Sequence, residues 1–169
     1  MIDNTFLKML WIKEYYLKNM DYSNVLYIEP FLNLNVPNFE DIFEEENLNF
    51  NFLSWDDLNN DHMFINNFDN WHMFPDSKFD VIISYNYFKL SDFDKIINEI
   101  YRILNNDGFF CLFVPYLKGV FNSKISFEYF INKLILLIKR KGFVIHHFSD
   151  NSLIKNSDLL EYCLICTKI

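Results

Sequence analysis

The sequence predicts one α/β domain built on a mostly parallel sheet with helices on both faces. Segments with strand patterns alternate with segments of helical periodicity along the 169 residues, and such alternation favours parallel strands joined by helices. The stretch FDVIISYNYF, residues 79–88, is a nearly continuous apolar run, as expected for a strand buried on both faces. Two strand-like segments close the chain at residues 143–148 and 161–168, with a polar loop between them.

The first half of the chain contains two predicted helices and three predicted strands. Residues 4–19 carry apolar side chains at helical spacing behind a capping residue, Asn4 or Thr5, and this N-terminal helix is expected to pack on the domain. The buried strand NVLYIEP, residues 24–30, is ended by Pro30. We then expect a short acidic helix at residues 38–46, a strand with one covered face at 48–55, and a weaker strand at 62–68.

The clearest predicted helix lies in the second half. Ser91 or Asp92 is expected to cap it, and its apolar residues share one face. The turn NNDG at residues 105–108 ends the helix, with Gly108 suited to a left-handed stop. The stretch FFCLFVP, residues 109–115, follows as another buried strand.

A further helix is predicted before the closing strands. Ser126 is expected to cap it, and it runs to about Lys141, where Gly142 ends it. We find no internal repeat and no linker, so residues 1–169 are expected to form a single domain.

Charge and hydropathy exclude two classes of partner. The formal net charge is −8, whereas a nucleic-acid partner requires a basic face that neutralises phosphates. The densest basic run, Lys139–Lys141, stands at a predicted helix end, where cations interact favourably with the helix dipole. No run reaches the roughly 20 apolar residues that a membrane span needs. We therefore expect no nucleic-acid partner and no membrane partner.

One stretch of the second half resembles a known family. Residues 79–115 place a Phe-Asp strand before a helix ending in Glu-x-x-Arg-x-Leu, followed by a glycine turn and a strand ending in proline. This order is similar to that of the class I S-adenosylmethionine-dependent methyltransferases. The matching residues are Phe79, Asp80, Glu99, Arg102, Leu104, Gly108 and Pro115. Glu99 and Arg102 are three residues apart on one helix and are expected to pair.

The resemblance extends over roughly residues 22–169. KRKGFVI, residues 139–145, resembles the glycine turn that enters the sixth strand, and EYCLICTK, residues 161–168, resembles the antiparallel seventh strand. The resemblance implies a Rossmann-like methyltransferase fold, with a seven-stranded, mostly parallel sheet and an antiparallel last strand. It also implies S-adenosylmethionine as the cofactor if the protein is active.

The family holds its cofactor with an acid-x-Gly-x-Gly-x-Gly turn after the first strand, and this turn is missing here. Glycine is needed there because a Cβ occupies the cofactor's space. Alignment of the strands places Tyr27 at the acid and Glu29, Phe31 and Asn33 at the glycines. No shift of the alignment restores the motif, since the first glycine of the chain is Gly108. We therefore expect no bound cofactor.

Three acidic positions are the candidate cofactor contacts if S-adenosylmethionine does bind. Glu29 can replace the lost acid of the first strand, with an exposed strand-end carboxylate as the alternative. The family's acid for the ribose hydroxyls corresponds to Asp56 or Asp57, for which we favour a helix or turn cap. Asp69 lies closest to the acid that meets the adenine amine in the family.

Tyr85 is the fourth candidate contact. It follows the apolar part of the fourth strand together with Asn86, at the place where the family binds substrate. We favour packing or a partner surface as the use of these aromatic residues. The Asn/Asp-Pro-Pro-aromatic motif of the amino-methylating members is missing, so no catalytic residue can be assigned.

Cysteine and histidine residues give no metal or nucleophile motif. Cys163 and Cys166 form a C-x-x-C pair without the second pair that structural zinc sites need, and on a strand they face opposite sides. His146 and His147 diverge for the same reason. The odd count of three cysteines, with no signal peptide, indicates a reducing, cytoplasmic setting.

Two functions compete for this sequence. The first is an active methyltransferase that transfers a methyl group by proximity and orientation. The second, which we favour, is a methyltransferase-like structural or regulatory subunit that binds a protein partner, in a homo- or hetero-oligomer. Binding of some other small molecule is a weaker third possibility. A fold does not specify a function, and the missing glycines argue against the chemistry.

Overall fold

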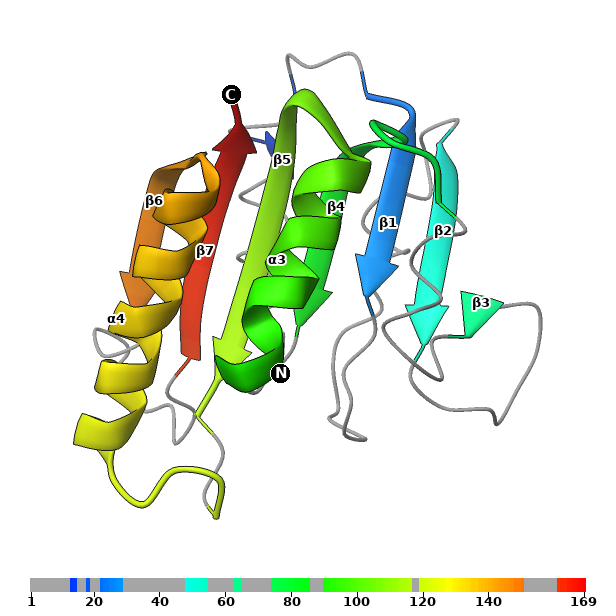
Figure 1. Ribbon diagram of the computed structural model, residues 1–169. Helices are drawn as coiled ribbons and strands as arrows, with labels where there is room; N and C mark the ends of the chain where they lie inside the picture. The colour runs from blue at the N-terminus through cyan, green and yellow to red at the C-terminus, as the bar shows by residue number, and fades with distance from the viewer. Residues whose placement is uncertain are drawn as a thin grey trace.

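Seven strands form one sheet in the order β3-β2-β1-β4-β5-β7-β6 (Figure 1). The computed structural model describes residues 13–14, 18, 22–28, 48–54, 63–64, 74–85, 90–116, 119–150 and 161–169. The strands are β1 (Asn24–Ile28), β2 (Asn49–Ser54), β3 (Met63–Phe64), β4 (Phe79–Tyr85), β5 (Leu104–Pro115), β6 (Phe143–Asp150) and β7 (Glu161–Lys168). Each lies within or overlaps a segment predicted to be a strand.

The sheet is parallel on one side and antiparallel on the other. β1 pairs in parallel with β2 and β4, β2 with β3, and β4 with β5. β7 is antiparallel to both of its neighbours, β5 and β6. The predicted mostly parallel sheet with an antiparallel last strand is therefore confirmed.

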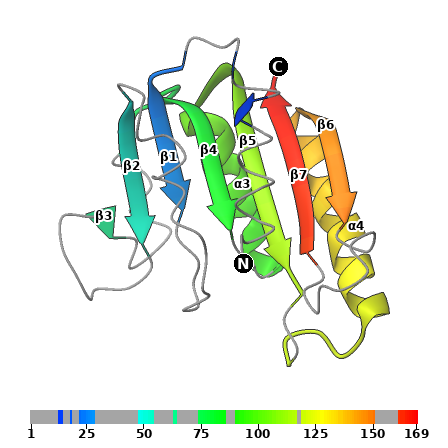
Figure 2. The same cartoon turned by 180° about the vertical axis from the view of Figure 1, so that it is seen from behind.

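Two helices, α3 (Leu90–Ile103) and α4 (Lys124–Lys141), cover the same face of the sheet. Both stand in front of the strands in Figure 1 and behind them in Figure 2, which turns the molecule by 180°. The helices predicted at residues 4–19 and 38–46 fall outside the described residues, except for positions 13–14 and 18. Within the described part of the chain, no helix is long and apolar enough to cross a membrane.

The core lies between the sheet and the two helices. Its largest fully buried side chains include Phe79, Phe93, Phe110 and Phe127. Each such ring stabilises the fold by roughly 1.5–3 kcal/mol relative to exposure. The second face of the sheet is buried too, with Val25, Val81, Ile83, Cys111 and Phe113 fully inaccessible. Burial on both faces explains why β1, β4 and the second half of β5 carry continuous apolar runs instead of alternating patterns.

The predicted cap of α4 at Ser126 is wrong by three residues. The cap is Ser123, whose side chain accepts a hydrogen bond from the backbone N–H of Ser126, while the Ser126 hydroxyl accepts one from the backbone of Ser123. This reciprocal pair is a capping box, in which the second serine lies one turn inside the helix. The predicted end at Gly142 is confirmed, with φ of 108°.

The predicted role of Gly108 is also wrong. β5 begins at Leu104, directly after α3 ends, and the left-handed residue in this segment is Asp107, with φ of 61°. A Cβ on Gly108 would lie 2.8 Å from the Asn105 carbonyl oxygen and 3.0 Å from that of Asp80. Gly108 is therefore required for close approach of β5 to its neighbours.

The predicted cap of α3, Ser91 or Asp92, is wrong by at least two residues. The helix starts at Leu90, so neither Ser91 nor Asp92 precedes it. Asp92 lies in the first turn, where a carboxylate interacts favourably with the helix dipole.

Candidate cofactor site

Four parallel strands end on one edge of the sheet. β1, β2, β4 and β5 end at Ile28, Ser54, Tyr85 and Pro115, and their arrowheads point to the same edge in Figure 1. β1 lies between β2 and β4, so the strand order reverses there. Open α/β sheets bind ligands at the carboxyl ends of strands beside such a reversal. The candidate site is therefore the edge between β1 and β4.

The end of β1 fixes where the predicted glycine positions fall. Tyr27 is 7% exposed and lies within the strand, and Ile28 is its last residue. Tyr27 thus stands next to the end of β1, and its alignment with the family's acid remains a prediction. Glu29, Phe31 and Asn33 follow the strand and lie outside the described residues.

Tyr85 is the one predicted contact whose side chain the structure describes. It is 5% exposed, and its ring stacks on that of Phe113 with a centroid separation of 6.1 Å. Its ring therefore contributes to packing on the second face of the sheet. Asp56, Asp69 and Asn86 lie outside the described residues, so their roles remain predictions, as does that of Asp57.

Ser84 is a polar residue at the same edge that the sequence reasoning missed. It lies level with Ile28 of β1 and Leu112 of β5 and is fully buried. In the described part of the structure, its hydroxyl oxygen has no hydrogen-bond partner. A buried unsatisfied hydroxyl costs roughly 1–3 kcal/mol of stability. The Ser84 hydroxyl can therefore gain a hydrogen bond from a ligand bound beside the strand reversal.

Asp80 ties strands together at the opposite edge of the sheet. Its carboxylate accepts hydrogen bonds from the backbone N–H groups of Ser23 and Asn24, each at 2.9 Å, and from the side-chain amide of Asn105. Burial acts to raise the pKa of Asp80, but these hydrogen bonds outweigh it and hold the pKa below its ordinary value. Asp80 therefore has a structural role, remote from the carboxyl ends of β1 and β4.

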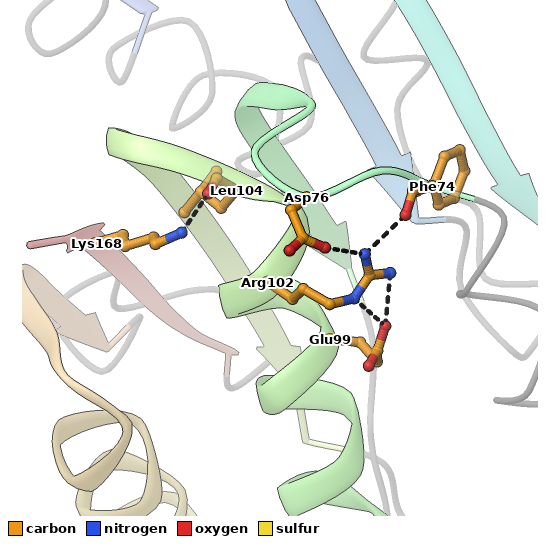
Figure 3. A network of polar contacts seen from close by, with 6 residues as sticks. All are labelled: Phe74, Asp76, Glu99, Arg102, Leu104 and Lys168. Carbon is orange, nitrogen blue, oxygen red and sulfur yellow. Dashed lines mark hydrogen bonds and ion pairs between the residues drawn. The ribbon is translucent and has the colours of Figure 1, made fainter.

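Arg102 fastens the turn before β4 to the end of α3 (Figure 3). Its guanidinium pairs with Glu99 at 2.9 Å, which confirms the predicted pair. It also donates to the Phe74 carbonyl at 2.8 Å and to Asp76 at 2.6 Å. These contacts explain the family-like Glu-x-x-Arg pattern as a structural device.

Lys168 joins the end of β7 to the start of β5. Its ammonium group donates to the Leu104 carbonyl at 2.8 Å (Figure 3) and lies 4.8 Å from the centre of the Tyr101 ring. Burial lowers the pKa of Lys168. Since β7 is antiparallel, Lys168 lies at the same edge as Arg102, far along the strands from the candidate site.

The cysteines and His146 contribute to packing. Cys111, Cys163 and Cys166 are buried free thiols, and burial raises the pKa of Cys111 and Cys166, so they are poor nucleophiles. A ring nitrogen of His146 lies 2.6 Å from the Thr167 hydroxyl. No group of side chains placed to hold a metal ion occurs among the described residues.

Comparisons with known proteins support one family. Residues 52–112 match the family model of a methyltransferase domain, a range that includes β4, α3 and most of β5. The resemblance to the class I methyltransferases is confirmed. No curated protein sequence matches the chain.

Solved structures show the methyltransferase fold over nearly the whole chain. The [4+2]-cyclase SpnF superposes with a TM-score of 0.66 at 11% identity, covering 96% of this chain and 80% of that one. A geranyl diphosphate methyltransferase bound to GPP and sinefungin gives 0.65 at 7% identity, covering 96% and 78%. A SAM-dependent methyltransferase from Archaeoglobus fulgidus gives 0.59 at 12% identity, covering 96% and 93%. At such identities the likeness establishes the fold alone.

Proposed function

We propose that this methyltransferase-like chain does not bind S-adenosylmethionine in the family's usual pose and acts as a structural or regulatory partner subunit. The observation that carries the proposal is the sequence that follows β1. β1 ends at Ile28 beside the strand reversal, and the residues that follow contain no glycine before Gly108. The glycine motif that contacts the cofactor in the family is therefore missing from this sequence.

Steric exclusion is the physical reason. Glycine positions in such turns let the backbone approach the ligand, and any Cβ takes up that space. Here a carboxylate, a large ring and an amide stand at the aligned positions Glu29, Phe31 and Asn33. The residues present do not fit S-adenosylmethionine in its usual orientation.

The described residues at this edge include no recognisable acid or base, but that does not decide between the two functions. Methyl transfer depends chiefly on placing the nucleophile in line with the sulfonium, so such an enzyme needs few catalytic side chains. The proposal therefore depends on whether the site has room for S-adenosylmethionine. One structural neighbour is described as a [4+2]-cyclase, which supports the view that this fold is not tied to a single activity.

An active methyltransferase with a divergent cofactor site is the alternative. The orphan hydroxyl of Ser84 favours it, because a buried polar atom without a partner beside the strand reversal suits a ligand. In that case Glu29, Asp56, Asp69 and Tyr85 are the candidate cofactor contacts.

Thermal unfolding with added ligand tests the proposal. A ligand that binds the folded state raises the melting temperature, and the rise grows with the logarithm of the ligand concentration once that exceeds the dissociation constant. We expect no shift with S-adenosylmethionine, S-adenosylhomocysteine or sinefungin up to millimolar concentration. A rise of several degrees that Ser84→Val abolishes would establish the alternative instead.

A further inference from the structure

The outward face of α4 carries an apolar stripe that the fold leaves exposed. Ile125, Tyr129 and Leu136 are 78%, 61% and 50% exposed, and the exposed Asn132 lies between them. These four residues, called the α4 stripe below, recur at spacings of four, three and four, so they lie along one side of the helix. The opposite side of α4 is buried against the sheet through Phe127, Leu134 and Ile138.

The charge of α4 is opposite to that of the whole chain. The helix carries Lys124, Lys133, Lys139, Arg140 and Lys141 against the single acid Glu128, a net charge of +4. The chain as a whole has a net charge of −8. Basic side chains thus concentrate on this one helix, and they include the exposed Lys133 and Arg140 beside the stripe.

Tyr129 of the α4 stripe contacts a basic side chain that lies next to the stripe. The Lys133 ammonium lies 5.4 Å from the centre of the Tyr129 ring, within the range of a cation–π interaction. On the other side Lys124 lies 3.9 Å from Glu128, so that cation is partly neutralised. Lys133 and Arg140 therefore provide the positive edge of the stripe.

We propose that the α4 stripe docks an amphipathic helix of a partner protein whose apolar seam is flanked by acidic residues. Spacings of four, three and four are those of a coiled-coil seam, in which flanking charges select the partner. Asn132 in the seam requires a polar partner residue and thereby fixes the register. This inference rests on the proposed role as a partner subunit and names the surface that it uses.

Two other occupants fit the charges less well. A second copy docked symmetrically through α4 would bring two helices of net charge +4 together, and like-charge juxtaposition opposes association. A membrane-surface helix needs a broad apolar face, with aromatic and leucine side chains reaching into the acyl boundary. The α4 stripe has only three apolar residues, interrupted by Asn132, so it lacks such a face.

A designed peptide provides the test. The probe is a fluorescent peptide of about three heptads with Leu at the seam, one Asn in it, and Glu at the flanking positions, which remains unpaired because its own acids repel. A matched peptide with Lys in place of Glu is the control. Binding to the full chain is measured by fluorescence anisotropy at low and physiological salt.

We expect the acidic peptide to bind and the basic peptide not to bind, with affinity falling as salt rises. Replacing Lys133 and Arg140 by Glu should weaken binding about tenfold. Tyr129→Ser with Leu136→Ser should remove it, since seam residues carry most of the contact energy. Lys95→Glu, a single charge reversal at an exposed position of α3, should change affinity less than about twofold.

Each other outcome overturns the inference. Equal binding of both peptides, or loss of binding with Lys95→Glu, would mean non-specific attraction. Dimerisation abolished by Leu136→Ser would identify a second copy as the occupant, and binding to phosphatidylserine vesicles lost in the same variant would identify a membrane. The charge-reversal variant keeps every apolar residue, so it reports on docking even if the serine variant unfolds. If neither the acidic peptide nor S-adenosylmethionine binds, docking through the α4 stripe is refuted, but the proposed role as a partner subunit is not.

Discussion

Tyr85 at the end of β4 stacks on Phe113 of β5, with ring planes inclined by 24°. Both rings lie on the second face of the sheet, two residues beyond the level of Tyr27. Tyr85 is 5% exposed and Phe113 is fully buried. Tyr85, which corresponds to the place where the family binds substrate, is therefore packed against an aromatic ring at the carboxyl ends of β4 and β5.

This stack should be measurable as a coupling energy. We expect Tyr85→Leu and Phe113→Leu to destabilise the fold less in combination than the sum of the single changes, by about 0.5–1.5 kcal/mol. Urea denaturation of the two single variants and the double variant gives the value. Strict additivity would mean that the rings pack independently.

Arg102→Ala should lower the free energy of unfolding by about 2 kcal/mol. The substitution removes hydrogen bonds to the Phe74 carbonyl and to Glu99, whose side chain is 21% exposed, and charged hydrogen bonds of this kind contribute roughly 1.5–3 kcal/mol. Asp76→Ala is the control, because Asp76 is 77% exposed and such surface pairs contribute little. Equal losses in both variants would contradict this account.

Asp80 should make stability depend on pH in the acid range. Its pKa is depressed in the folded state, so its contribution is present above the unfolded value of about 3.9 and is lost as pH falls through the lower folded value. The stability difference between the native protein and Asp80→Ala should be constant above about pH 5 and should shrink below about pH 4. Denaturation of both proteins across this range measures it. A stability difference that grows as the pH falls would show that the pKa of Asp80 is raised, not lowered, in the folded state.

Gly108→Ala should destabilise through crowding by about 1–3 kcal/mol. The new Cβ would meet the Asn105 carbonyl oxygen at 2.8 Å and the Leu104 side chain at 2.9 Å. Gly119→Ala is the matched control, because nothing lies within 4 Å of its Cβ and only its φ of 95° opposes the change. Thermal unfolding compares the two. A smaller loss at Gly108 than at Gly119 would count against the close approach.

Local patterns were sufficient to predict most of the sheet and both described helices. Burial on two faces imposes continuous apolar runs such as that of β4, and one-sided burial gives α3 its stripe. The errors at Gly108 and Ser126 arise where the pattern is ambiguous. Two serines three residues apart both resemble a cap, and the carbonyl of Asp80 that crowds Gly108 belongs to a neighbouring strand.

The site was less accessible to sequence reasoning than the fold. Arg102 was predicted to pair with Glu99, but its contact with Phe74 joins residues 28 positions apart, which no local pattern reveals. The orphan hydroxyl of Ser84 depends on its neighbours in β1 and β5 and has no sequence signal. Glu29, Asp56 and Asp69 were proposed by resemblance and remain predictions.

Isothermal titration calorimetry with S-adenosylmethionine and S-adenosylhomocysteine tests the central claim most directly. Exclusion by the side chains aligned with the family's glycines, Glu29, Phe31 and Asn33, predicts flat titrations for both ligands at millimolar concentration, which corresponds to binding weaker than about −4 kcal/mol. Saturable heat with a dissociation constant in the low micromolar range would contradict it, and loss of that heat in Ser84→Val would place the ligand beside Ser84.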